Sequence, residues 1–314
     1  YYVSVNHKTQ IFVYWNIEDQ PIEFPKKIRA VYEKNYKLNR VRFTNWIDKF
    51  NLKNREDIDW WMTLPPTRDP YKSQLLNYIS AIDTLKKISP KNLKIYTNSD
   101  TKFNLLSKSF KKFSKKVKVK NKEQFKFLSI YLGYFKSIIF QLIIFIYINC
   151  FIKKKIITGK NLTIIDIFVT NDAKQNANFY PPFQNKKKEI LFVPTFIQTF
   201  NFFKLFKIIH TISKNNNYLF KEHNLSIADL FYSFFHIFRR KKFLKLKFFY
   251  KNFDLSEIVH EEIKNFNDFN SIFIGLINYK FFKNLKIKKV KINKTINWFE
   301  NQIIDKGWNL GFRK

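Results

Sequence analysis

The side chains most typical of a ligand site are those of Glu300, Asn301 and Gln302, a carboxylate and two carboxamides in a row. They follow an apolar run, residues 295–299, that predicts a strand, and they precede a helical pattern. The partial positive charge at a helix start favours an ionised carboxylate by about 0.3 to 1 kcal/mol. Such a carboxylate can orient a hydroxyl group or accept its proton. We therefore expect Glu300 to be catalytic, with Asn301, Gln302 and Lys306 binding substrate; in the alternative, Asn301 only caps the helix.

A second polar cluster follows residues 57–63, which predict another strand. Arg68, Asp69 and Ser73 lie after it, in a segment that contains three prolines. Ligands of open α/β sheets bind at the carboxyl ends of strands, and a guanidinium group holds a carboxylate or phosphate through a fork of donors. We expect these three residues to bind substrate. In the alternative, Arg68 pairs with Asp69 or Asp59 and merely fixes the loop.

Strand and helix patterns alternate along most of the chain. Strands are expected at residues 11–15, 93–96, 117–119, 163–169 and 190–193, and helices at 40–50, 71–88, 102–113, 199–213, 227–238, 255–264 and 270–285. This order predicts an α/β fold, a Rossmann-like open and mostly parallel sheet flanked by helices. We expect a single domain over residues 1–314, with residues 1–39 as an N-terminal arm.

A long apolar segment interrupts this alternation. Lys136 is the only charged residue between positions 127 and 152, and lysines flank the segment on both sides. A membrane-spanning helix usually has more positive charge at one end than at the other. We therefore expect residues 122–158 to form a long hydrophobic helix that lies on the domain or on a membrane surface. A protein built around a spanning helix is the alternative.

The chain is strongly basic: it has 58 Lys and Arg against 24 Asp and Glu, a net charge of +34. Such charge suggests a nucleic-acid partner. However, the 38 Phe, the 16 Tyr and the many Lys, Ile and Asn are residues with A/T-rich codons, so genome composition explains the same excess. We therefore expect no nucleic-acid partner. The single cysteine and five histidines lack the spacing of metal ligands, and we expect no metal and no cofactor.

Two motifs carry a resemblance to a known family. The first is Trp-Trp-x-x-x-Pro-x-x-Arg-Asp-x-Tyr-x-Ser, from Trp60 to Ser73; the second is Trp-Phe-Glu-Asn-Gln-x-x-Asp-Lys-Gly-x-Asn-x-Gly-Phe-Arg, from Trp298 to Arg313. Together they resemble a bacterial surface-carbohydrate biosynthesis family of glycosyltransferases. The similarity extends from about Arg40 to the end of the chain. Many members have Arg-Asn where this chain has Arg68-Asp69, which leaves the role of Asp69 open.

The resemblance implies the N-terminal, acceptor-side half of a two-Rossmann-domain (GT-B) glycosyltransferase. The nucleotide-sugar donor would bind to a C-terminal half that is absent here, so we expect this piece to be inactive alone. The reaction would extend a glycan or lipid-linked acceptor during synthesis of O-antigen, lipopolysaccharide or capsule. Glu300 would face the reaction centre and Arg68 an anionic group. The location would be cytoplasmic, peripheral on an anionic inner membrane surface. The alternative is a basic, RNA-associated or ribosome-type structural protein from an A/T-rich genome.

Overall fold

The computed structural model describes residues 5–6, 10–16, 26–68, 72–88, 92–96, 100–109, 123–155, 157, 162–169, 190–196, 201–297 and 302–313. Where the sequence suggested one domain over residues 1–314, the chain forms two compact units, each assembled from separate segments. Unit 1 comprises Tyr1–Arg55, Thr63–Phe127 and Arg240–Phe266; unit 2 comprises Glu56–Met62, Leu128–Arg239 and Asn267–Lys314.

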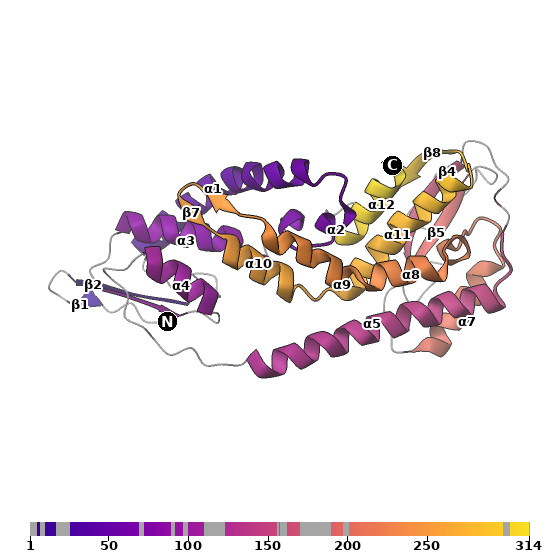
Figure 1. Cartoon of the computed structure of the whole chain (residues 1–314), viewed down its shortest axis with the longest axis horizontal. Helices are drawn as coiled ribbons and strands as arrows, with labels where there is room; N and C mark the ends of the chain where they lie inside the picture. The colour runs from indigo at the N-terminus through magenta and orange to yellow at the C-terminus, as the bar shows by residue number, and fades with distance from the viewer. Residues whose placement is uncertain are drawn as a thin grey trace. The chain divides into compact units, whose positions relative to one another are not determined.

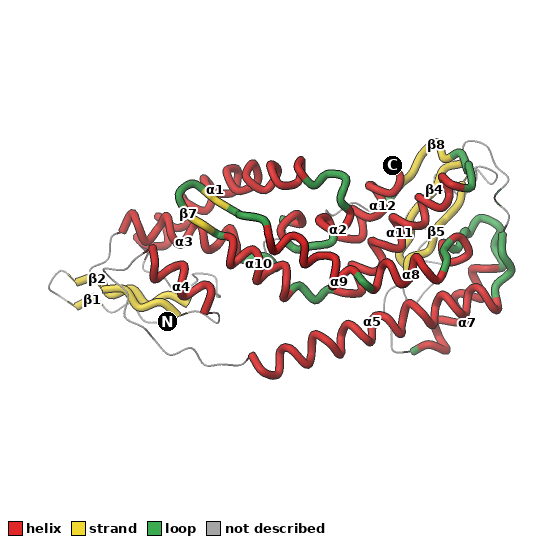
Figure 2. Tube along the Cα trace, viewed as in Figure 1, coloured by secondary structure: helices red, strands yellow, loops and turns green. Residues whose placement is uncertain are grey.

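Unit 1 is mainly helical and has a small sheet of order β1-β2-β3 (Figures 1 and 2). Its elements are β1 (Val5–Asn6), β2 (Gln10–Asn16), α1 (Lys26–Lys53), η1 (Pro65–Thr67), α3 (Leu75–Ile88), β3 (Asn92–Tyr96), α4 (Asp100–Ser109), η4 (Arg240–Lys245), β6 (Phe249–Tyr250), β7 (Phe253–Asp254) and α10 (Ser256–Asn265). Strand β2 pairs antiparallel with β1 and parallel with β3. Part of the segment expected to be an arm, residues 1–39, is thus a sheet strand and the start of α1.

Unit 2 holds the longer helices and a second sheet. Its elements are α2 (Ile58–Trp61), α5 (Glu123–Phe151, from Leu128 onward), β4 (Leu162–Val169), β5 (Ile190–Phe196), α7 (Phe202–Ser213), η3 (Lys221–Asn224), α8 (Ile227–Phe234), α9 (His236–Arg239), α11 (Phe269–Ile287), β8 (Ile292–Ile296) and α12 (Ile303–Arg313). The sheet has the order β5-β4-β8, and both pairings are parallel. A small parallel sheet flanked by helices agrees with the α/β class expected from the sequence.

Alternation along β4 and β5 gives this sheet two different faces. Ile165 and Ile167 of β4, with Phe192 of β5, belong to an apolar core completed by buried residues of α5 and α7. Asp166 and Thr195 point the other way, because successive side chains of a strand project to opposite faces. The helices α5 and α7 therefore cover the apolar face. The face that carries Asp166 and Thr195 lies toward α11 and η3.

Helices α11 and α12 approach each other unusually closely. A Cβ atom on Gly307 would lie 1.8 Å from the backbone oxygen of Gly275, and one on Gly311 would lie 2.9 Å from the Cα atom of Tyr279. Only glycine permits such a backbone approach. The two glycines of the second sequence motif are thus explained by helix packing and need no role in ligand binding.

Most of the elements expected from periodicity are confirmed, but several bounds are wrong. The strand expected at residues 295–299 is β8, Ile292–Ile296, and the helix expected at residues 40–50 is part of α1, which begins at Lys26. Residues 57–63 do not form a strand: Asp57 caps the short helix α2, and its side chain accepts a hydrogen bond from the backbone N–H of Asp59. Strand β5 continues through Pro194 to Phe196 instead of ending at Val193. Proline is tolerated there because β5 lies at the edge of its sheet. The strand expected at residues 117–119 lies outside the described residues.

Candidate functional site

The start of α12 is capped by the chain itself. The backbone N–H of Gln302 donates to the Oδ2 atom of Asp305 over 3.0 Å, and the backbone oxygen of Gln302 accepts from Lys306. Asp305 is buried, so its carboxylate already lies at the positive end of the helix. The backbone N–H of Gln302, at the start of the helix, therefore binds the carboxylate of Asp305 instead of a ligand. Gln302 is placed at the predicted location, with its backbone in a structural role.

The structure brings part of the first motif against the second. The ammonium group of Lys306 lies 5.6 Å from the centre of the Trp61 ring, and Arg313 forms an ion pair with Glu56 at 3.1 Å. Lys306 is only 7% exposed, so it does not project into solvent as a free cation. It serves instead to hold α12 against α2, through the attraction of a cation to an aromatic face.

A polar network lies on the face of the parallel sheet opposite α5 and α7. Thr195 donates to Asp166 over 2.7 Å, and the ammonium group of Lys221 donates to Thr195 over 2.9 Å and to Asn278 over 2.8 Å. Burial raises the pKa of Asp166 against the opposing effects of Lys221 and Thr195, and the nearby carboxylate of Asp305 raises it further. Burial also lowers the pKa of Lys221. The network is fully buried, so it can fix strands and helices but cannot meet a substrate directly.

Asp59 anchors helix α2 through two basic side chains. His236 contacts its Oδ1 atom at 2.9 Å, and Arg239 donates to both carboxylate oxygens at 2.8 and 2.9 Å. Burial opposes ionisation of Asp59, but the hydrogen bonds from His236 and Arg239 outweigh it and hold the pKa below its usual range. An Asp–His pair resembles part of a proton-transfer site. Because His236 is 1% exposed, this pair is structural in the observed conformation.

Arg68, in unit 1, pairs with a residue that was not considered from the sequence alone. Its side chain bonds to Asp48 of α1. The residue has a positive φ of 55° and ends the short helix η1. Burial lowers its pKa. The expectation that this residue follows a strand is wrong, because α2 and η1 precede it; the guanidinium group is about one third exposed and remains available to an anion from that side.

Ser73 contacts a carboxylate that the sequence did not single out. Its hydroxyl donates to Glu262 at 2.9 Å, and the backbone N–H of Gln74 donates to the same carboxylate at 3.0 Å. Burial raises the pKa of Glu262 to about 7, against the opposing effect of these hydrogen bonds. A carboxyl group with this pKa can give or take a proton near neutral pH. Within unit 1, Glu262 is therefore the residue best suited to acid–base chemistry.

Three of the expected site residues, Glu300, Asn301 and Asp69, lie outside the described residues. The structure places Gln302 and Lys306 together in unit 2 and Arg68 and Ser73 in unit 1. The partners that sequence reasoning missed, Asp48, His236 and Glu262, are 20 to 189 positions away along the chain from the residues they contact. No local pattern signals such pairs.

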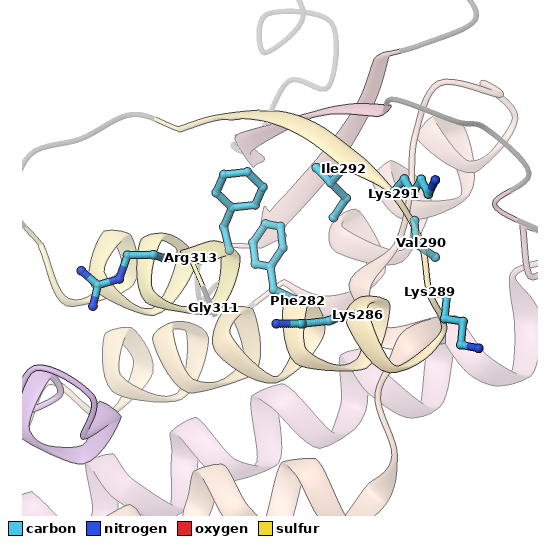
Figure 3. Close-up of a pocket in the computed structure, with 9 residues that line it drawn as sticks. Phe282, Lys286, Lys289, Val290, Lys291, Ile292, Gly311 and Arg313 are labelled. Carbon is cyan, nitrogen blue, oxygen red and sulfur yellow. The ribbon is translucent and has the colours of Figure 1, made fainter.

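A surface pocket of about 390 Å³ lies where α11 and α12 end and β8 begins. Its lining combines Phe282, Val290, Ile292, Gly311 and Phe312 with the cations Lys286, Lys289, Lys291 and Arg313 (Figure 3). Of the expected site residues that the structure describes, none lines it. Arg313 and Lys289 point away from each other in Figure 3, and cations are favoured at helix carboxyl ends in any case. The lining charge is thus accounted for without a ligand.

Other observations bear on cofactors and relatives. Within the ranges that the structure describes, no three His, Cys, Asp or Glu residues are grouped so as to hold a metal ion. No match was found for this chain among protein-family models, curated proteins or solved structures. The function of this chain is therefore inferred from its residues and their geometry.

Proposed function

We propose that this chain is the acceptor-side part of a glycosyltransferase that builds a surface polysaccharide. The observation that carries the proposal is the proximity, in unit 2, of the start of the first motif to the second motif. Trp61 of the first motif contacts Lys306 of the second, and α12 follows β8, a strand of a parallel sheet. In open α/β sheets, ligands bind beyond the carboxyl ends of the strands. Residue Glu300 follows the carboxyl end of β8 by four positions.

In this proposal, Glu300 is the general base or orienting carboxylate for an acceptor hydroxyl. Asn301 would assist it through its carboxamide. Gln302 and Lys306 would act indirectly, because they fix α12 relative to α2. Arg68 would bind an anionic group of the acceptor, and Ser73 would position Glu262. The donor class is a nucleotide sugar, and the Rossmann-like, two-domain architecture is part of the same proposal.

The decisive experiment measures sugar transfer by the whole gene product that contains this chain. Radiolabelled nucleotide sugars are supplied with lipid-linked acceptors extracted from membranes. We expect Glu300→Gln to reduce turnover at least about a hundredfold, the usual scale for the loss of a general acid or base. Glu257→Gln, the same substitution at an exposed position of α10, should leave turnover unchanged. Equal turnover in both variants would remove the role of Glu300, and no transfer from any nucleotide sugar would contradict the proposed function.

An RNA-associated structural role is the second candidate, and the basic pocket is the observation that favours it. Phe312 is 39% exposed beside Lys286, Lys289 and Arg313, and aromatic and basic side chains together suit single-stranded RNA. The RNA-associated role ranks second because the negative carboxyl ends of α11 and α12 both lie at this pocket and favour cations there without any RNA. Nanomolar RNA binding that weakens steeply with added salt would favour it.

A further inference from the structure

One side of helix α5 carries a continuous apolar stripe that no other part of the described structure covers. The stripe consists of Leu128, Leu132, Phe135, Ile139 and Ile146, which are 54 to 62% exposed. At 100° per residue, these side chains fall within a sector of about 60°, and they extend over about 27 Å of helix. Exposed apolar patches of this continuity mark interaction surfaces.

The opposite side of the same helix is committed to the core of unit 2. Phe140, Ile144 and Ile148 are at most 1% exposed and pack with residues of β4, β5 and α7. Farther along the chain toward the N-terminus, the hydroxyl of Tyr134 donates to the backbone oxygen of Phe234 over 2.9 Å. The helix is therefore fixed along its length, and its stripe faces outward from a rigid support.

After its first residue, Glu123, the charged residues of α5 and of the segment that follows it are all lysines. From Gln124 to Ile165 the sequence holds six lysines and no aspartate or glutamate. Lys136 lies on the exposed surface of α5, and Lys153 and Lys154 are exposed just after its end. Lysines that flank an exposed apolar stripe match a surface that is apolar inside and anionic outside, such as a bilayer with acidic headgroups.

The geometry also separates lying on a bilayer from crossing it. Leu128–Phe151 is the one helical segment in the described ranges that is long and apolar enough to span a membrane. A spanning position would require its buried side to leave the sheet and expose Ile165, Phe192 and their neighbours. A position in the plane of the interface keeps that core intact and buries only the stripe.

We propose that the outer stripe of α5 is a membrane-docking surface that lays unit 2 on an anionic bilayer without crossing it. The five side chains enter the boundary between headgroups and acyl chains, and the flanking lysines contact acidic headgroups. The proposal goes beyond the glycosyltransferase function and does not depend on it. It would also hold for a protein with no transfer activity.

The test uses the chain synthesised in the presence of vesicles and then separated by flotation. The vesicles contain phosphatidylcholine alone or phosphatidylcholine mixed with phosphatidylglycerol. We expect flotation with the anionic vesicles only, decreasing as salt is added. The double variant Phe135→Asp with Ile139→Asp should reduce the bound fraction at least about tenfold, because it removes apolar contact and adds negative charge.

A matched control makes the same change elsewhere. Leu52 and Ile287 are 70% and 69% exposed and lie outside the stripe, so Leu52→Asp with Ile287→Asp alters net charge equally. This control should float like the wild type, and circular dichroism should show that both double variants are folded. Equal flotation of the stripe variant and the wild type would overturn the proposal. So would a wild-type dimer that the stripe variant converts to a monomer without any vesicle binding, or wild-type chain that resists extraction by alkaline carbonate.

Discussion

Asp59 in unit 2 is buried and Glu262 in unit 1 is partly buried, and their pKa values move in opposite directions. Asp59 receives hydrogen bonds from Arg239 and contacts His236, whereas Glu262 receives hydrogen bonds only from a hydroxyl and a backbone amide. Burial acts on both in the same sense. For these two carboxylates, the difference is the direct hydrogen bonding of Asp59 to Arg239 and His236. A nearby cation alone is not enough, because the pKa of Asp166 is raised although Lys221 opposes the shift.

Replacing Asp59 should have the largest effect. Asp59→Asn removes the charge that His236 and Arg239 share, and the loss of one partner from a buried ion pair costs about 3 to 5 kcal/mol of unfolding free energy. Because the folded-state pKa lies below the ordinary value of 3.8, this stabilisation is present above that pH and disappears as the pH falls through the folded pKa. Urea denaturation at several pH values measures both effects.

The matched control for this variant is Asp57→Asn. Asp57 caps α2, and asparagine caps helices about as well as aspartate, so the change should be within about 0.5 kcal/mol. If the two substitutions proved equally mild, the bidentate pair with Arg239 would not stabilise unit 2. The contrast between the two carboxylates would then lose its basis.

Replacing Glu262 should change the free energy of unfolding less than replacing Asp59 does. At alkaline pH the replacement should raise that free energy instead of lowering it. The folded-state pKa of Glu262, about 7, lies above the ordinary value of 4.5, so the folded protein binds more protons between those values. Stability contributed by this group therefore falls as the pH rises from 4.5 to 7 and is constant above. Glu262→Gln should remove that dependence and be the more stable form at pH 8, by up to about 3 kcal/mol.

The control is Glu257→Gln on the same helix, at an exposed position. This variant keeps Glu262 and should therefore retain the wild-type fall in stability between pH 4.5 and 7. Chemical denaturation of the three proteins between pH 4 and pH 8 gives the comparison. A Glu262 variant whose stability follows the wild-type curve in parallel would show that the folded-state pKa is ordinary, and Glu262 would lose its claim to acid–base chemistry.

The smallest effect on the free energy of unfolding concerns a third carboxylate, Asp229. Like Glu262 it has neutral hydrogen-bond donors, and like Asp59 it has a basic side chain nearby. It receives hydrogen bonds from Ser226 and Asn284, and Lys280 lies 3.4 Å away. Ser226 and Asp229 form a capping box at the start of α8. Ser226→Ala should cost about 1 kcal/mol, the usual value for a lost N-cap. Ser213→Ala, which removes only a hydroxyl bonded within helix α7, should cost less than about 0.5 kcal/mol; equal costs would show that the box adds nothing.

Much of the element order was predictable from the sequence, since α3, α7, α11 and the strands β2, β3 and β4 carry clear periodic patterns. The error at residues 57–63 arose because a short apolar run fits a strand and a buried helical turn equally well. The capping box of α8 is a local feature, because Ser226 and Asp229 are only three positions apart. The partners of Asp59, Arg68 and Ser73 were not predictable, because each depends on tertiary folding that brings distant segments together.

The contact between Gly275 and Gly307 limits which residue can stand at position 307. Three of the 5 glycines in the chain, Gly275, Gly307 and Gly311, lie at the crossing of α11 and α12. A methyl group on Gly307 would lie 1.8 Å from the backbone oxygen of Gly275, so no side-chain rearrangement could make room for it. Any larger residue at position 307 would therefore force the two helix backbones apart.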